Sequence, residues 1–191
     1  MNFPEQNLAE DWHVPICEGG KTLKEVLKEM QPFKLKPNDV PFIIKLMENP
    51  KYHFGFFPGA VSLLNHDCIH AILGRGVLPK DEAFVIGFTM GSTKKMTKLK
   101  SKIFLFIAKY LYPEGYKFKE EEAWVFKMGA IAGSKCPANL SKVDFRWFNN
   151  WTLEEIRKKL LIDVDFLRLC YLLEKKRFPE SRESDRLICT I

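Results

Sequence analysis

The stretch Asn65-His66-Asp67-Cys68-Ile69-His70 holds two of the four histidines of the chain and lies among apolar residues. We expect residues 60–73 to be helical. His66 and His70 would then lie on one face, one turn apart. Asp67 would lie about 100° round the same turn, close enough to converge with both imidazoles on a shared ion.

Glycine and proline indicate where this helix ends and the next one begins. Gly74 can supply the left-handed residue that closes a helix, and Pro79 suits the first turn of the following helix. Glu82 would therefore lie near a helix N-terminus, where the helix dipole favours a carboxylate. From there its side chain can point back at the histidines.

The pattern predicts a metal site made of His66, Asp67, His70 and Glu82, held between two adjacent helices. Unpaired charges are costly to bury, and a bound cation would compensate two carboxylates and two imidazoles together. A polar cluster packed in the core without a metal is the alternative that the residues leave open. Mixed nitrogen and oxygen ligands favour zinc, with iron, manganese or cobalt as alternatives, and argue against calcium.

The same four residues resemble a known motif. His66-Asp67, two residues, His70, eleven residues and Glu82 match the HD-x2-H-x11-E motif of the Coq-four family of coenzyme Q (ubiquinone) biosynthesis proteins. Residues 151–157 resemble a segment near the family's C-terminal end, so that the resemblance spans roughly residues 58–163. It implies that the four motif residues are metal ligands and the catalytic centre. Residues 84–92 differ from the Trp and Gln-Thr-Gly-Leu-Pro-like run that usually follows the glutamate, so the substrate wall would differ.

The resemblance also implies a function. Coq-four proteins act on a polyprenylated hydroxybenzoate precursor, promote oxidative loss of its C1 carboxylate, and organise the ubiquinone-forming enzymes. The expected partners are therefore an isoprenoid or polyprenyl-aromatic lipid and other quinone-biosynthesis proteins, with the oligomeric state open. Phenylalanine-rich helices and a groove at Gly87 and Gly91 would accommodate the isoprenoid tail, and the lysine run at 94–102 would rest on anionic lipid.

Two other functions are consistent with the residues. The sequence around His66-Asp67 is similar to the core of HD-domain metal-dependent phosphohydrolases, which need a further histidine and a distant aspartate; His53 and Asp144 are the available candidates. A non-catalytic lipid-binding or scaffold protein, in which a structural metal pins two helices, is the third hypothesis.

Composition bounds these hypotheses. The chain has 191 residues, enough for one domain with a core. Lysine and arginine exceed the acidic residues by 30 to 24, giving a net charge of +6, but the lysines cluster in one short run without a recognition motif, so we expect no nucleic-acid partner. No apolar run approaches the length of a membrane span, and no signal or transit peptide is recognised. We therefore expect a protein that is cytoplasmic or peripheral on the cytoplasmic membrane face. Five scattered cysteines predict no disulfide framework.

Helical periodicity predicts an all-α, single-domain multi-helix bundle without strands. Residues 1–20 are expected to form an irregular N-terminal arm, 21–177 the helical domain and 178–191 a charged C-terminal tail. Thr22 with Glu25, and Thr152 with Glu155, each match a capping box at the start of a helix. The other expected helices cover residues 38–49, the segment after Glu82, and residues 103–111, 119–132 and 163–176. Gly87 and Gly91, four residues apart, would let another helix or a ligand chain approach closely.

Overall fold

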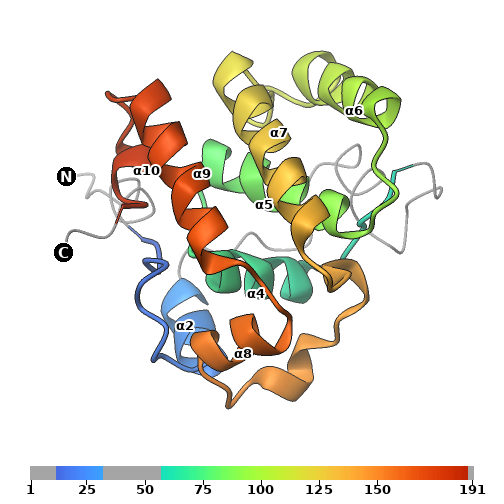
Figure 1. Cartoon of the computed structure of the whole chain (residues 1–191). Coiled ribbons are helices and arrows are strands. Elements are labelled where there is room, and N and C mark those ends of the chain that lie inside the picture. Colours follow the sequence, from blue (N-terminus) through green and yellow to red (C-terminus); the bar gives the residue numbers. More distant parts are fainter. Residues whose placement is uncertain (1–11, 32–56, 189–191) are drawn as a thin grey trace, which may run out of the picture.

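The computed structural model describes residues 12–31 and 57–188 and confirms an all-α, single-domain bundle (Figure 1). No strand occurs in these two ranges. The predicted helix at 38–49 and the candidate His53 lie outside them. The elements are α2 (Leu23–Met30), α4 (Leu63–Leu73), α5 (Pro79–Ser92), α6 (Lys98–Tyr110), α7 (Glu120–Lys135), α8 (Leu153–Lys159), α9 (Val164–Arg177) and α10 (Arg182–Asp185), with 3-10 turns η2 (Leu140–Lys142) and η3 (Phe145–Phe148).

Helices α5 and α7 form the closest helix pair. A Cβ atom added at Gly133 of α7 would lie 2.8 Å from the carbonyl carbon of Phe88 on α5, and one added at Gly129 would lie 3.1 Å from the carbonyl carbon of Phe84. Gly87 and Gly91 of α5 face the α7 backbone in the same way. The predicted close approach at Gly87 and Gly91 is therefore confirmed. The partner is a helix, and no groove remains there for a ligand chain.

Many phenylalanine side chains pack in the core. Phe104 of α6 stacks on Phe126 of α7 with ring centroids 4.8 Å apart, and Phe118 and Tyr112 complete an edge-on cluster around Phe104. Phe84, Phe88 and Phe145 are also buried, with at most 1% of their surface exposed. Burial of each such side chain contributes on the order of 2 kcal/mol.

The two predicted capping boxes lie side by side. Thr22 and Glu25 cap α2, and Thr152 and Glu155 cap α8, with both reciprocal hydrogen bonds present in each box. Thr22 and Thr152 form an isolated antiparallel bridge. The N-termini of α2 and α8 are thereby tied together although 130 residues separate them in sequence.

The residues that flank the helices also pack on the bundle. Val14, Ile16 and Leu187 belong to the core, each at most 3% exposed, and His13 Nε2 lies 2.8 Å from the carbonyl oxygen of Arg186. Cys68, Cys136 and Cys170 are buried free thiols. The expectation that the cysteines form no disulfides needs one correction, because Cys17 is disulfide-bonded. In the described ranges, the helices are too short or too polar to cross a membrane.

Candidate metal centre

Helices α4 and α5 bring together three of the four predicted ligands. Glu82 lies between the two histidines, with its Oε2 atom 3.3 Å from His66 Nε2 and its Oε1 atom 3.3 Å from His70 Nε2. The imidazole rings meet edge to face, with centroids 4.6 Å apart. One ligand atom from each residue lies within 4.8 Å of the other two, so these three residues could hold a metal ion.

The predicted helix boundaries explain this convergence. Ser62 caps α4, and Gly74 ends it with φ = 70°, the left-handed conformation that glycine adopts without strain. Pro79 opens α5 and places Glu82 in its first turn. The short connection of residues 74–78 lets Glu82, in the first turn of α5, lie 3.3 Å from both His66 and His70 of α4.

The ring orientation of His70 is set by a backbone carbonyl. Its Nδ1 atom lies 2.6 Å from the carbonyl oxygen of Gly76. A carbonyl oxygen only accepts hydrogen bonds, so Nδ1 carries a proton and donates. In the neutral imidazole this leaves a lone pair on Nε2, the atom that faces Glu82. Metal-binding histidines commonly donate their other ring N–H to such an acceptor, which fixes the tautomer.

The Nε2 atoms of His66 and His70 are buried and form no well-aligned hydrogen bond with any residue that the structure describes. Each lies near the Glu82 carboxylate without hydrogen-bond alignment, which for a lone pair beside an anion is unfavourable unless a cation lies between them. Two imidazole nitrogens and a carboxylate form a donor set suited to zinc and other borderline divalent ions. The three residues therefore fit a metal ion.

Burial and mutual charge shift the pKa values of these groups. Burial lowers the pKa of His66. Burial alone would also lower the pKa of His70, but the Glu82 carboxylate outweighs it and raises that pKa. Burial would raise the pKa of Glu82, but the two histidines reverse this and lower it. The three groups are therefore coupled, because the Glu82 carboxylate favours the protonated form of His70 and the two histidines favour the ionised form of Glu82.

The structure does not bring Asp67 into this group. Asp67 is buried in α4, 8% exposed, but its carboxylate is not among the converging ligand atoms. Its position in the helix, next to His66 in sequence and about 100° round from it, does not bring its carboxylate into the group. Its charge opposes the effect of burial, which lowers the pKa of His66, and adds to the larger effect of Glu82, which raises the pKa of His70. Asp67 therefore acts on the site through its charge.

Sequence reasoning missed the residues that hold the turn around His70. The backbone N–H of Arg75 donates to the carbonyl oxygen of His70 at 3.0 Å. The Arg75 guanidinium is fully buried and donates to both oxygens of Glu174, at 3.1 and 2.6 Å. It also lies 4.0 Å from the ring centroid of Phe84 and 4.4 Å from that of Tyr171. Burial alone would lower the pKa of Arg75, but the Glu174 carboxylate raises it, so the Arg75 guanidinium stays protonated.

Two further side chains hold the C-terminal end of α4. Arg157 Nε donates to the carbonyl oxygen of Ile72 at 2.7 Å, and the Tyr171 hydroxyl donates to that of Leu73. The last carbonyl groups of a helix lack partners within it, so these contacts fix the end of the helix that carries His70. Their donors lie on α8 and α9, far along the chain, and no local pattern predicts them.

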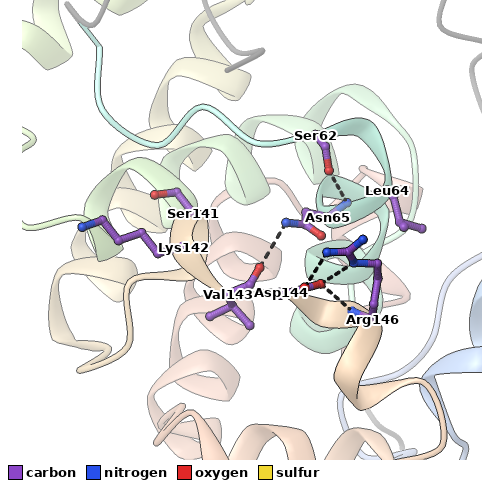
Figure 2. A pocket seen from close by; sticks show the side chains of 8 residues that line it. All are labelled: Ser62, Leu64, Asn65, Ser141, Lys142, Val143, Asp144 and Arg146. Atoms are coloured by element: carbon purple, nitrogen blue, oxygen red, sulfur yellow. Dashed lines mark hydrogen bonds and ion pairs between the residues drawn. The ribbon is translucent and has the colours of Figure 1, made fainter. Parts of the chain in front are cut away.

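Asp144, the aspartate that a phosphohydrolase site would require, lies elsewhere. It caps η3 and pairs with Arg146 at 2.7 Å. Figure 2 shows both among the side chains that line a pocket, where the Asn65 amide donates to the Val143 carbonyl oxygen. The volume of this pocket is about 400 Å³. The pocket is lined by Ser62, Leu64, Asn65, Ser141, Lys142, Val143, Asp144 and Arg146. Asp144 is not among the ligand atoms that converge near His66 and His70.

No protein-family model, curated protein or solved structure matches this chain.

Proposed function

We propose that this protein binds one divalent metal ion through Nε2 of His66, Nε2 of His70 and the carboxylate of Glu82. One observation carries the proposal. Two buried imidazole nitrogens without well-aligned hydrogen-bond partners in residues 12–31 and 57–188 converge on one carboxylate. The Gly76 carbonyl sets one of the two rings in the metal-binding tautomer.

The donor set favours a site with an exchangeable position. Three protein ligands leave a fourth position for water or substrate, as in catalytic zinc sites. The Glu82 side chain is 34% exposed, whereas that of His70 is 1% exposed, so Glu82 forms the side of the site that faces solvent. An ion held there supplies Lewis acidity towards a substrate oxygen or a bound water. Zinc is our first candidate.

For the substrate we propose a polyprenylated aromatic carboxylate of quinone biosynthesis, with loss of the ring carboxylate as the reaction. The support is the spacing of His66, His70 and Glu82 and the oxygen-binding character of the donor set. The isoprenoid tail would bind at a surface other than Gly87 and Gly91, since α7 covers both glycines. Asp67, the remaining motif residue, would tune the two imidazoles electrostatically.

The geometry does not favour the phosphohydrolase alternative. Its aspartate would have to join the histidines, but Asp144 is engaged with Arg146 at η3. A scaffold with a structural metal predicts the same ligands without turnover, so the two hypotheses differ in what a substrate experiment would show.

The first experiment is elemental analysis of untagged protein after zinc reconstitution and desalting. We expect about one equivalent of metal in the wild type, and its loss in His70→Ala and Glu82→Ala. The matched control is Lys119→Ala, an exposed helix cap far along the chain from the site, which should retain the metal. Absence of metal from reconstituted wild-type protein would overturn the proposal.

The second experiment offers the metal-loaded protein a prenylated hydroxybenzoate labelled at its carboxylate carbon, in the presence of oxygen. Release of labelled carbon dioxide by the wild type and not by Glu82→Ala supports the enzyme. Stoichiometric metal, a large fall in melting temperature on chelation and no release of label would instead support the scaffold.

A further inference from the structure

Helix α6 is apolar on two opposite faces. Its inner face packs on the core through Phe104 and Ala108, which are fully buried. Its outer face carries Leu99, Phe106 and Tyr110, which are 66%, 59% and 58% exposed. A helix on the surface of a globular domain normally turns charged and polar residues outward, so an apolar outer face needs a separate explanation.

The three exposed residues and the half-buried Ile103 form a continuous strip along the helix. Leu99, Ile103, Phe106 and Tyr110 follow one another at four, three and four residues, the spacing that keeps side chains on one face. We call these four residues the outer strip of α6. The rings of Phe106 and Tyr110 lie 5.0 Å apart and form one aromatic unit. Figure 1 places α6 at the edge of the bundle, beside α7.

Positive charge borders the outer strip. Lys95, Lys98 and Lys102 are exposed and form no ion pair with the described residues. Lysines 98 and 102 fall within the first turns of α6, and the helix contains no acidic residue. An exposed apolar face marks a binding surface, and the unpaired cations specify that the bound surface is anionic.

We propose that the outer strip of α6 docks on the surface of an anionic lipid bilayer. An interfacial helix of this kind lies in the membrane plane with its apolar side chains at the boundary between headgroups and acyl chains. Aromatic rings such as those of Phe106 and Tyr110 favour that depth. Lys95, Lys98 and Lys102 are held at the negatively charged surface by the lipid headgroups.

Charge complementarity favours this occupant over a second copy of the chain. Two α6 helices packed through their outer strips would bring lysines of one copy near lysines of the other, with no acidic residue on either helix to compensate. Like charges brought together at an interface destabilise it. At an anionic bilayer the interaction is attractive instead, because each lysine then meets a negatively charged headgroup.

The docking surface is independent of the metal centre, which lies on α4 and α5. Membrane binding would bring the protein to apolar substrates, but it can be measured without any assay of a reaction. Failure of the metal experiments would leave this inference unaffected, and the converse also holds.

The test is co-sedimentation of the full chain with vesicles of phosphatidylcholine alone or with 30% phosphatidylserine, at about 0.1 M salt. We expect binding to the anionic vesicles only. Combined Lys95→Ala, Lys98→Ala and Lys102→Ala should weaken it about 100-fold, and Phe106→Ser about 10-fold or more. Raising the salt to about 1 M, where screening is nearly complete, should release the protein.

Trp147→Ser provides a matched control, because Trp147 is 80% exposed but lies on η3 and not on α6. It should bind like the wild type. Equal binding to both vesicle types, no binding to either, or binding unchanged in Phe106→Ser would overturn the proposal. Analytical ultracentrifugation without lipid tests whether a second copy of the chain binds the outer strip instead. A dimer that Phe106→Ser abolishes would assign the strip to self-association and refute membrane docking.

Discussion

Replacing Gly133 with alanine should destabilise the protein by forcing α5 and α7 apart. The new Cβ would lie 2.8 Å from the carbonyl carbon and 2.9 Å from the Cα of Phe88, and closer still to its carbonyl oxygen. All of these are backbone atoms, and α5 cannot move one of them without shifting as a helix. Normal contact between carbon atoms needs about 3.5 Å, so the two helices must separate by several tenths of an ångström or more.

The size of the effect follows from two opposing contributions. Alanine in a helix interior is favoured over glycine by about 1 kcal/mol, so a position with free space would gain stability. Overpacking a tight core typically costs ~1–3 kcal/mol, and a clash with helix backbone, which cannot move aside like a side chain, belongs at the upper end of that range. We expect a net loss of roughly 2 kcal/mol, which at this chain length lowers the melting temperature by about 4–8 °C.

The measurement is thermal unfolding followed by circular dichroism at 222 nm, with wild type and variant in the same chelator-containing buffer. Gly87→Ala should lower the melting temperature as Gly133→Ala does, because its Cβ would meet the Phe126 carbonyl group of α7. Gly20→Ala is the matched control, since a Cβ at Gly20 has no heavy atom within 4 Å, and its melting temperature should stay within about 2 °C of wild type. A Gly133→Ala protein as stable as the wild type would refute the helix contact.

Three other predictions test the surroundings of the metal centre. Glu174→Gln removes the anion that is hydrogen-bonded to the buried Arg75 guanidinium and leaves only Asp81, whose Oδ1 lies 3.8 Å away. It should lower the free energy of unfolding in urea by about 3 kcal/mol, the lower end of the range for a broken buried pair, whereas Glu174→Leu combined with Arg75→Met should restore much of that loss. A Glu174→Gln protein as stable as wild type would contradict the ion pair. Asp67→Asn should keep a zinc stoichiometry close to that of wild type by elemental analysis, and loss of the metal would make Asp67 a ligand. Burial raises the pKa of Cys170 to about 11, so its thiolate fraction at pH 8 is about one in a thousand. At pH 8, iodoacetamide should therefore label Cys170 only after the protein is unfolded in urea, and labelling should accelerate as the pH rises towards 11. Rapid labelling of Cys170 in the native protein at pH 8 would count against this burial.

Local patterns predicted the helices that carry the site because helix formation depends on near neighbours. The capping boxes at Thr22 and Thr152, the helix end at Gly74 and the helix start at Pro79 all follow from hydrogen bonds and backbone angles within a few residues. The same periodicity placed His66 on the face that His70 shares.

Local patterns failed where the answer depended on a distant segment. The sequence grouped Asp67 with the ligands because it is adjacent to His66, but the direction of α5 relative to α4 decides which side chains Glu82 can reach. Likewise, Gly87 and Gly91 indicated only that something approaches closely, and a helix some 40 residues further on proves to fill the space.

The sequence by itself determined an all-α chain with two histidines and a glutamate at metal-binding positions, because these features arise from spacing along one or two helices. Only the tertiary structure decided that Asp67 stays outside the converging group, that the Gly76 carbonyl sets the tautomer of His70, and that Arg75 is neutralised by Glu174, 99 residues away. The physical reason is that helix formation is local, whereas burying a charge requires a partner that folding brings from elsewhere in the chain.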